Sequence, residues 1–273
     1  MHGANMDQSP KNVRKVTMQV DVKLDNEIII SGVDWYWFTT GFTRAVRKGV
    51  AALSEDWRDT GVLKHQVVMQ HIEAGAVPQV FMFRKILLGH SSGWSDGFVE
   101  LLREVRMAAP MYIIAAGTEP GQGLVMARSA DGSDGELSLS GPDSKWFIAQ
   151  SNYEPWWPDP KSDPRKTAAV AMLSQFGQPL GADGVGLFAV LSTFPVLNPN
   201  TAYTTVMRPA AGTLQAFVRD ASCPETTKDF PFPDPRYCQP VGKGGWPRGQ
   251  ELQSRVQGGG VDVGGFIDVP LVW

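Results

Sequence analysis

Asparagine and arginine side chains near the middle of the sequence could take part in acyl-transfer chemistry. Asn152 carries an amide that can donate to an oxyanion, and Arg165 carries a guanidinium that can bind a carboxylate or a carbonyl. His2, Asn5 and Asp7 form a second polar group at the start of the chain. An aspartate there can hold an ammonium group or orient a nucleophile. The set contains no nucleophile, so the residues alone leave these roles incomplete.

Arg165 follows a pattern typical of a helix start. Asp163 is a favoured N-cap residue, and Pro164 suits the first helical position. A cation in the first turn faces the positive end of the helix dipole, which costs up to about 1 kcal/mol. Two interpretations stay open: a solvated arginine whose stem packs on Trp156 or Trp157, or an arginine that points into a site.

Composition places the chain among folded globular proteins. The 273 residues are 42% hydrophobic and 19% charged, enough for a large core in one domain or two. The net charge of -3 gives no electrostatic reason to expect a nucleic-acid partner. Histidines are few and scattered, so we predict no metal site and no cofactor.

Targeting and redox signals point in different directions. The sequence has no apolar run long enough for a membrane-spanning helix, and residues 1–16 lack the apolar segment of a signal peptide. Cys223 and Cys238 lie in a Pro-rich region, where they form either a small disulfide-closed loop or two free thiols. A disulfide would require an oxidising compartment.

The predicted elements run in the order strands, helices, strands, helices, strands. Alternating apolar residues from 16 to 33 predict a hairpin that turns at Asp25 and Asn26. A second strand pair is expected towards Leu53. The order indicates an α+β fold, with antiparallel sheets packed face to face and helices outside. Further helices are predicted around 63–72, 77–88, 96–105, 163–176 and 187–192, and strands at 111–116, 123–129, 136–140, 145–150, 203–208 and 213–219.

Residues 1–220 are predicted to form one domain, followed by a Pro/Gly-rich tail at 221–273. Within the domain, aromatic residues cluster between Trp35 and Phe42. Such clusters usually belong to the core, and a pocket for a lipid chain is the alternative.

Three motif-like segments have simpler explanations. Residues 89–93 match G-x-S-x-G, but a helix is expected before them where a nucleophile elbow needs a strand. The glycine-rich segment 117–123 lies between two predicted strands, which favours a hairpin turn over a phosphate-binding loop. Residues 131–135 lack the remaining ligands of a calcium loop, so a turn is expected there.

Four segments resemble the family of acid ceramidase and N-acylethanolamine-hydrolysing acid amidase. They are SNYEPWWPDPKSDPRKTAA at 151–169, the stretch from VLSTFPVLN to AFVRD at 190–220, APMY with the hairpin after it at 109–128, and HGANMD at 2–7. The matches follow the family's order along the chain. This resemblance is specific because it is long and ordered.

The resemblance implies an N-terminal-nucleophile hydrolase with an αββα sandwich. In this family a precursor cleaves itself to expose a cysteine, which attacks an N-acyl amide and uses its own α-amine as general base. By position, the resemblance gives Asn152 the oxyanion role, Asp7 a place beside the nucleophile's amine, and Arg165 the role of an active-site arginine. Substrate contacts are expected from Asn5, Trp35, Trp37, Phe42 and Tyr153.

Two departures from the family pattern bear on activity. The family cysteine precedes the His-Gly pair, so the nucleophile, the first strand and the upstream subunit with its signal peptide are expected to be missing here. Ala4 stands where the family has an arginine. We therefore expect this chain, as written, not to hydrolyse amides. A truncated portion of an active enzyme is favoured over a non-catalytic relative, because Asp7, Asn152 and Arg165 remain.

The sequence thus predicts a part of an enzyme that hydrolyses the amide bond of N-acyl lipids. Ceramide, cleaved to sphingosine and a fatty acid, is the first expected substrate, and N-acylethanolamines are the alternative. A lipid-binding pseudoenzyme is the other alternative. The resemblance further implies an upstream subunit or propeptide as partner, and a lysosomal or secreted location.

Overall fold

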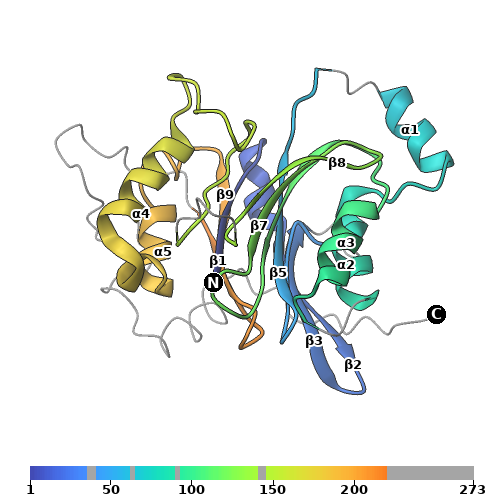
Figure 1. The fold of residues 1–273 in the computed structure, drawn as a ribbon, viewed down its shortest axis with the longest axis horizontal. Helices are drawn as coiled ribbons and strands as arrows, with labels where there is room; N and C mark the ends of the chain where they lie inside the picture. Colours follow the sequence, from blue (N-terminus) through green and yellow to red (C-terminus); the bar gives the residue numbers. More distant parts are fainter. Residues whose placement is uncertain (36–40, 62–64, 90–92, 141–145, 220–273) are drawn as a thin grey trace.

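The computed structural model describes residues 1–35, 41–61, 65–89, 93–140 and 146–219. They form four layers, with helices, a seven-stranded sheet, a three-stranded sheet and further helices in that order (Figure 1). The expected αββα arrangement is confirmed. The tail predicted at 221–273 lies outside the described residues.

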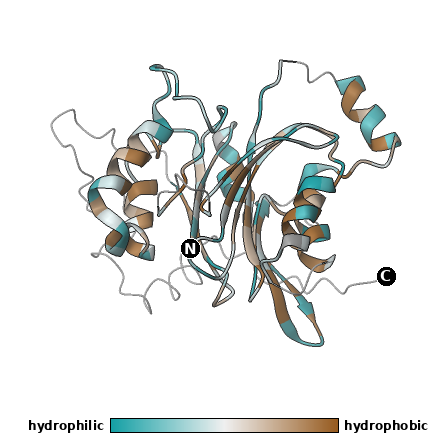
Figure 2. Cartoon of the chain, in the orientation of Figure 1, coloured by the Kyte–Doolittle hydropathy of each residue, from teal (hydrophilic) through white to brown (hydrophobic). Residues whose placement is uncertain are grey.

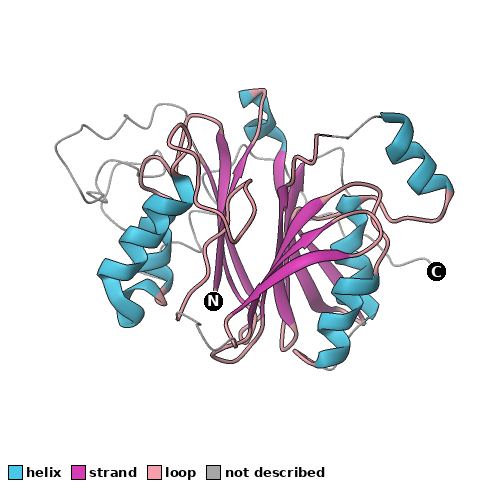
Figure 3. Cartoon of the chain, turned by 45° about the horizontal axis from the view of Figure 1, so that its top comes forward, coloured by secondary structure: helices cyan, strands magenta, loops and turns pink. Residues whose placement is uncertain are grey.

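The larger sheet is an antiparallel meander, in which each strand pairs with its neighbours in the sequence. Figure 3 draws the strands of both sheets in magenta. Its first hairpin turns at Asp25 and Asn26, whose φ angles are 51° and 66°. Asn and Asp tolerate this left-handed conformation, which two-residue hairpin turns require. The strands are β2 (Thr17–Leu24), β3 (Glu27–Trp35), β4 (Arg44–Arg47), β5 (Ala51–Trp57), β6 (Met111–Ala116), β7 (Gly123–Arg128) and β8 (Ser133–Ser138).

Three helices lie between β5 and β6 in the sequence: α1 (His65–Glu73), α2 (Gln79–Gly89) and α3 (Asp96–Glu104). The Ser95 hydroxyl caps α3 by accepting from the backbone N–H of Phe98. Apolar side chains of α2 and α3 pack on the larger sheet, and Figure 2 shows the hydrophobic colour along the strands that they cover. In contrast, α1 buries none of its side chains against the rest of the described chain.

The smaller sheet has the order β1 (His2–Asp7), β9 (Thr201–Arg208) and β10 (Thr213–Val218), all antiparallel. Its outer face is covered by α5 (Gly184–Leu191), where Phe188 packs on Val206 and Phe217. The helix α4 (Arg165–Gly181) packs beside α5. The short 3-10 helix η1 (Lys11–Val16) follows β1.

The two sheets enclose a second core. Alternate residues of each strand face it, so Val33 and Trp35 lie between the sheets while Ile30 faces the helices. Tyr203 of β9 meets Trp35 edge-on, with ring centroids 6.4 Å apart. This packing fixes the position of β1 relative to β5, which matters for the site described below.

Three local predictions are wrong. Residues 146–150 do not form a strand; instead Trp146 and Phe147 pack against α4. The α4 helix begins after Pro164, so Asp163 is not its N-cap, and the helix continues beyond residue 176 through a kink at Gly177 (φ 68°). The strand β1 was not predicted at all. Among the described residues, no helix has the length and apolarity needed to span a bilayer.

Candidate active site

Arg165 is the centre of a polar cluster at one end of the sandwich. Its Nε and Nη2 donate to the two carboxylate oxygens of Asp163, at 2.7 and 2.8 Å. Its Nη1 donates to Asp7 Oδ2 at 3.0 Å, and Nη2 also donates to Asn152 Oδ1 at 2.9 Å. Arg165 therefore points into a site. Its pKa is raised, chiefly by the hydrogen bonds to Asp163, so the guanidinium stays charged.

Asn152 is held with a defined orientation by this arginine. Its Oδ1 accepts from Arg165, and its Nδ2 donates to the backbone carbonyl of Trp57 at 2.9 Å. An amide nitrogen has two hydrogens, and no second acceptor binds Nδ2 in the described part of the chain. One amide N–H thus stays available for an external oxygen.

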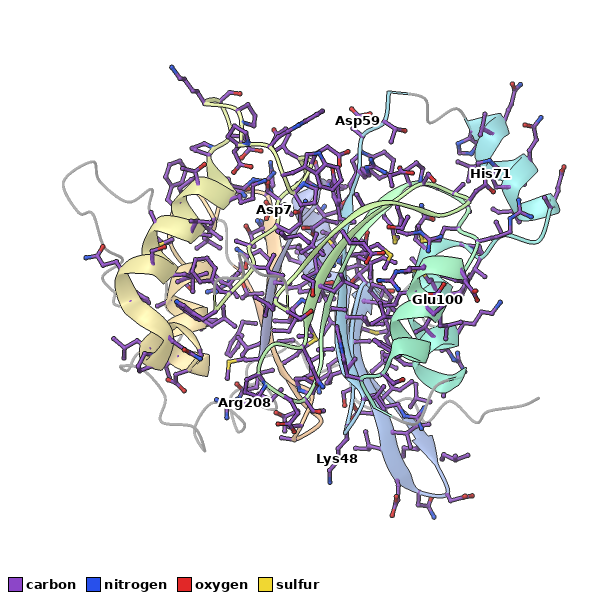
Figure 4. All side chains as sticks on the ribbon, viewed as in Figure 1. Asp7, Lys48, Asp59, His71, Glu100 and Arg208 are labelled. Atoms are coloured by element: carbon purple, nitrogen blue, oxygen red, sulfur yellow. The ribbon has the colours of Figure 1, made fainter. Side chains whose placement is uncertain are left out.

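Asp7 lies at the end of β1, and both of its carboxylate oxygens accept hydrogen bonds. Beyond Arg165, its Oδ2 accepts from Asn198 Nδ2 and its Oδ1 accepts from the hydroxyl of Thr201, both at 2.6 Å. The three catalytic candidates from the sequence, Asp7, Asn152 and Arg165, are therefore brought together from distant positions. Figure 4 shows Asp7 towards the same end of the sandwich as Asp59, away from Lys48 and Arg208.

Tyr153 belongs to the same cluster, because its hydroxyl donates to Asp163 Oδ2 at 3.0 Å. Burial and this carboxylate raise the pKa of Tyr153, which keeps the hydroxyl protonated. Residue Asn5 faces the other way. Its Nδ2 donates to the carbonyls of Leu191 and Val196, and its Oδ1 accepts from Thr204, so it connects β1 to α5 and β9.

A buried arginine that the sequence did not single out lies close by. Arg44 of β4 is 1% exposed and donates to the backbone carbonyls of Thr43, Glu55 and Asn5, at 2.7, 2.6 and 3.0 Å. It also donates to Asp56 Oδ1 at 3.3 Å. Arg44 thus crosses from the larger sheet to β1 of the smaller one. Nothing local in the sequence distinguishes this arginine from the exposed ones.

Three carboxyl groups around Arg44 are poised to be neutral. Burial raises the pKa of Asp34 to about 7 and that of Asp56 to about 7, against the attraction of Arg44. Burial also raises the pKa of Glu55. The Oδ2 atom of Asp34 has no hydrogen-bond partner among the described residues. Asp34 and Asp56 therefore favour protonation in mildly acidic solution.

We expect the chain to become more stable as the pH falls from about 8 to about 5. A carboxyl whose pKa is raised on folding stabilises the fold while protonated, and that contribution is lost as the pH rises through about 7 for Asp34 and Asp56. His2 opposes this below about pH 6.5, because burial lowers its pKa to about 3 and only the unfolded imidazole gains a proton. One imidazole does not outweigh three carboxyls.

Replacing Asp34 with asparagine tests this expectation. The variant keeps the acceptor for the Trp35 backbone N–H and removes the ionisation. We expect Asp34→Asn to raise the unfolding free energy at about pH 8 by on the order of 2 kcal/mol, with little effect at about pH 5. Urea unfolding across this range measures it. Asp131→Asn, at a side chain 77% exposed, is the control. Parallel pH profiles for wild type and Asp34→Asn would contradict the assignment.

A cavity of about 540 Å³ adjoins the cluster. It reaches Trp57, whose carbonyl binds Asn152, and Gln8, which follows Asp7. Its lining is mostly apolar, and Glu55 is its acidic member. The apolar part is formed by Pro10, Val13, Val16, Trp35, Trp57, Val80, Pro110 and Met111, and the rest by Gln8, Ser9, Asn12, Thr43, Glu55 and Gln79.

Of the aromatic residues expected to contact substrate, Trp35 lines this cavity. Phe42 lies elsewhere: it is 2% exposed and packs in the core over Gly32, where a Cβ would approach its ring to 2.1 Å. Trp37 lies outside the described residues. Within the described ranges, no cluster of His, Cys, Asp and Glu could hold a metal ion.

The chain is similar to two groups of curated proteins. No protein-family model matches the chain. The chain is 32% identical over 210 residues to the N-acylethanolamine-hydrolyzing acid amidase of Mus musculus, covering 77% of the chain and 57% of that protein. It is 25% identical over 241 residues to the acid ceramidase of Pan troglodytes, covering 82% and 60% respectively. The chain thus spans little more than half the length of these curated relatives.

A solved structure extends the likeness to the fold. The N-acylethanolamine-hydrolyzing acid amidase orthologue of Caenorhabditis elegans superimposes with a TM-score of 0.66 and 26% sequence identity, covering 77% of this chain and 87% of that one. Its fold is that of an N-terminal-nucleophile hydrolase. The chain therefore belongs to the family of the N-acylethanolamine-hydrolyzing acid amidases and the acid ceramidases.

Proposed function

We propose that this chain forms part of an enzyme that hydrolyses the amide bond of N-acyl lipids. One observation carries the proposal: Asp7, Asn152 and Arg165 come from distant parts of the sequence and meet within hydrogen-bonding distance beside an apolar cavity. Such a cavity suits an acyl chain, and the polar cluster suits the amide at its end. Both lipid amides of the relatives' names, ceramide and N-acylethanolamine, fit this chemistry.

Each residue of the cluster has a role in the proposal. The free N–H of Asn152 Nδ2 donates to the oxyanion of the tetrahedral intermediate. Arg165 holds the Asn152 amide in that orientation and neutralises Asp7. Asp7, at the end of β1, orients the ammonium of the nucleophile. The carboxyl of Glu55, in the cavity lining, faces the polar end of the substrate.

The nucleophile is a further requirement of the proposal. Both cysteines of this sequence, Cys223 and Cys238, lie outside the described residues. By the family resemblance, we propose that the nucleophile is a cysteine on a segment upstream of His2 in a longer protein. Ala4 lacks the cation of the family pattern. The guanidinium of Arg44, 3.0 Å from the Asn5 carbonyl, supplies a positive charge next to this position from the opposite sheet.

The test begins with the gene sequence upstream of Met1 and continues with the longer protein that it encodes. We expect this protein to release fatty acid from N-acylethanolamine or ceramide vesicles at about pH 5. Asn152→Ala is expected to lower kcat about 10²- to 10³-fold through loss of the oxyanion donor. Asn200→Ala, at an exposed residue after the site, is the matched control.

Over alignments of similar length, the identity is 32% to the amidase (210 residues) and 25% to the ceramidase (241 residues), so the ethanolamide is the first substrate to assay. An upstream reading frame without a cysteine would refute hydrolysis by this mechanism. Lipid that binds to the longer protein without release of fatty acid would instead favour a non-catalytic lipid-binding relative.

A further inference from the structure

A buried carboxylate outside the cluster joins the two segments that carry Asn152 and Arg165. The side chain of Asp159 is 0% exposed. Its Oδ1 accepts from the hydroxyl of Ser151 at 2.8 Å. Its Oδ2 accepts from the backbone N–H groups of Lys166 and Thr167, at 2.5 and 3.2 Å.

These three bonds involve residues that are sequence neighbours of Asn152 and Arg165. Ser151 directly precedes Asn152, and Lys166 directly follows Arg165. One carboxylate therefore ties the neighbour of the asparagine to the neighbour of the arginine. Arg165 Nη2 itself donates to Asn152 Oδ1 at 2.9 Å.

Asp159 also caps α4. The first N–H groups of a helix lack partners within the helix, and the residue before α4, Pro164, has no side-chain acceptor. The sequence pattern pointed to Asp163 as the cap, but its carboxylate is occupied by Arg165 and Tyr153. A carboxylate at this end of the helix is favoured by the helix dipole. It also offsets the cost of the Arg165 cation there.

Helix capping alone does not account for the other contacts. Lys166 Nζ lies 3.8 Å from Asp159 Oδ1 and donates to the carbonyls of Trp157 and Glu154, at 2.8 and 3.2 Å. Residues 151–160 form turns and bends, and within this described segment there is no helix or strand to hold the backbone. The side-chain bonds from Asp159 and Lys166 thus fix the loop that presents Asn152.

We propose that Asp159 is a positioning residue, which sets the distance and orientation between Asn152 and Arg165. Among the described residues, Asp159 accepts hydrogen bonds from Ser151, Lys166 and Thr167 and from no side chain of the cluster. It acts through Ser151 and the first turn of α4. The proposal rests on the proposed function only in what the Asn152 amide does once it is positioned. The placement of that amide is a property of this chain and can be measured without turnover.

The first test is Asp159→Asn in the 273-residue chain. Asparagine has nearly the same shape but only one acceptor oxygen, so it cannot accept from both Ser151 and the helix N–H groups. The readouts are the Asn152 side-chain amide and Arg165 Nε–H signals in ¹⁵N NMR spectra, identified by their loss in Asn152→Asp and Arg165→Lys. We expect the Asn152 amide to shift, and the Arg165 Nε–H to exchange with water about tenfold faster.

Asp183→Asn is the control, because Asp183 caps α5 by accepting from the Val185 N–H and has no contact with the cluster. It is expected to leave both signals in place. Unchanged Asn152 and Arg165 signals in Asp159→Asn would overturn the proposal. An equal change in Asp183→Asn would also overturn it, since the effect would then report general loosening.

Ser151→Ala decides the case if Asp159→Asn does not fold. This change keeps the helix cap and removes only the bond to the asparagine loop. We expect the NMR signal of the Asn152 side-chain amide to shift while α4 stays intact. An unchanged signal would refute the positioning role. In the longer protein, Asp159→Asn should lower kcat with KM unchanged. Moved NMR signals in a protein that hydrolyses neither lipid would uphold the positioning role and refute the proposed function.

Discussion

Replacing Arg44 with methionine is expected to lower the free energy of unfolding by about 3–5 kcal/mol at neutral pH. Arg44 is 1% exposed, and its removal leaves the Asp56 carboxylate and three backbone carbonyls without their donor. Methionine fills most of the volume, so lost packing contributes little. The loss should be larger at about pH 8 than at about pH 5, because protonated Asp34 and Asp56 need no counter-ion.

Urea unfolding of both proteins across this pH range measures the effect. Arg106→Met is the control, because Arg106 is 50% exposed and pairs with an aspartate that is 77% exposed. Exposed pairs of this kind contribute about 0–1 kcal/mol. A loss for Arg44→Met that is no larger than the loss for Arg106→Met would show that Arg44 does not hold the two sheets together.

Replacing Arg165 with methionine is expected to remove any activity of the longer protein and to destabilise the chain by about 2–3 kcal/mol. The change removes the bidentate pair with Asp163 and the bonds to Asp7 and Asn152. Arg165→Lys should restore the charge without the fork geometry, and therefore recover part of the stability but not the orientation of Asn152. Enzyme assays and urea unfolding separate the two losses.

The pH dependence of this loss differs from that at Arg44. The hydrogen bonds from Arg165 lower the pKa of Asp163, so this pair stabilises the fold above the carboxyl's ordinary pKa. That contribution is lost as the pH falls through the lowered pKa. The part of the difference between wild type and Arg165→Met that comes from the Asp163 pair should therefore shrink below about pH 4. Arg106→Met is the control, because its partner Asp131 is 77% exposed. A difference that grows in acid would contradict the assignment.

Local signals in the sequence predicted the elements that are stabilised locally. The Asp25-Asn26 turn was found because neighbouring residues determine it. The segment 146–150 was wrongly predicted as a strand. Its apolar pattern fits a strand, but it fits equally well a non-strand segment whose Trp146 and Phe147 pack on α4. Periodicity shows that such residues are buried, but not which element they pack on.

The residues of the candidate site also differ in how far the sequence could predict them. The family resemblance pointed to Asp7, Asn152 and Arg165, and the structure brings them together. It gave no sign of Arg44, which depends on contacts with distant backbone. It also gave no sign of Asp159, whose partners Ser151 and Lys166 lie eight and seven positions away. The carbonyl of Asn5, for example, lies 39 positions from Arg44 in the sequence. Burial and hydrogen bonding of this kind become visible only when the sheets are in place.

The pairing of β1 with β9 has a consequence for how the protein folds. Strands of the larger sheet pair with neighbours in the sequence, so they can form early with small losses of chain entropy. The smaller sheet joins Asp7 to Thr201, 194 positions away, and closing that loop has to wait for most of the chain. The polar cluster is completed by this last closure. A chain that has completed its larger sheet but not its smaller one is therefore compact yet still without its site.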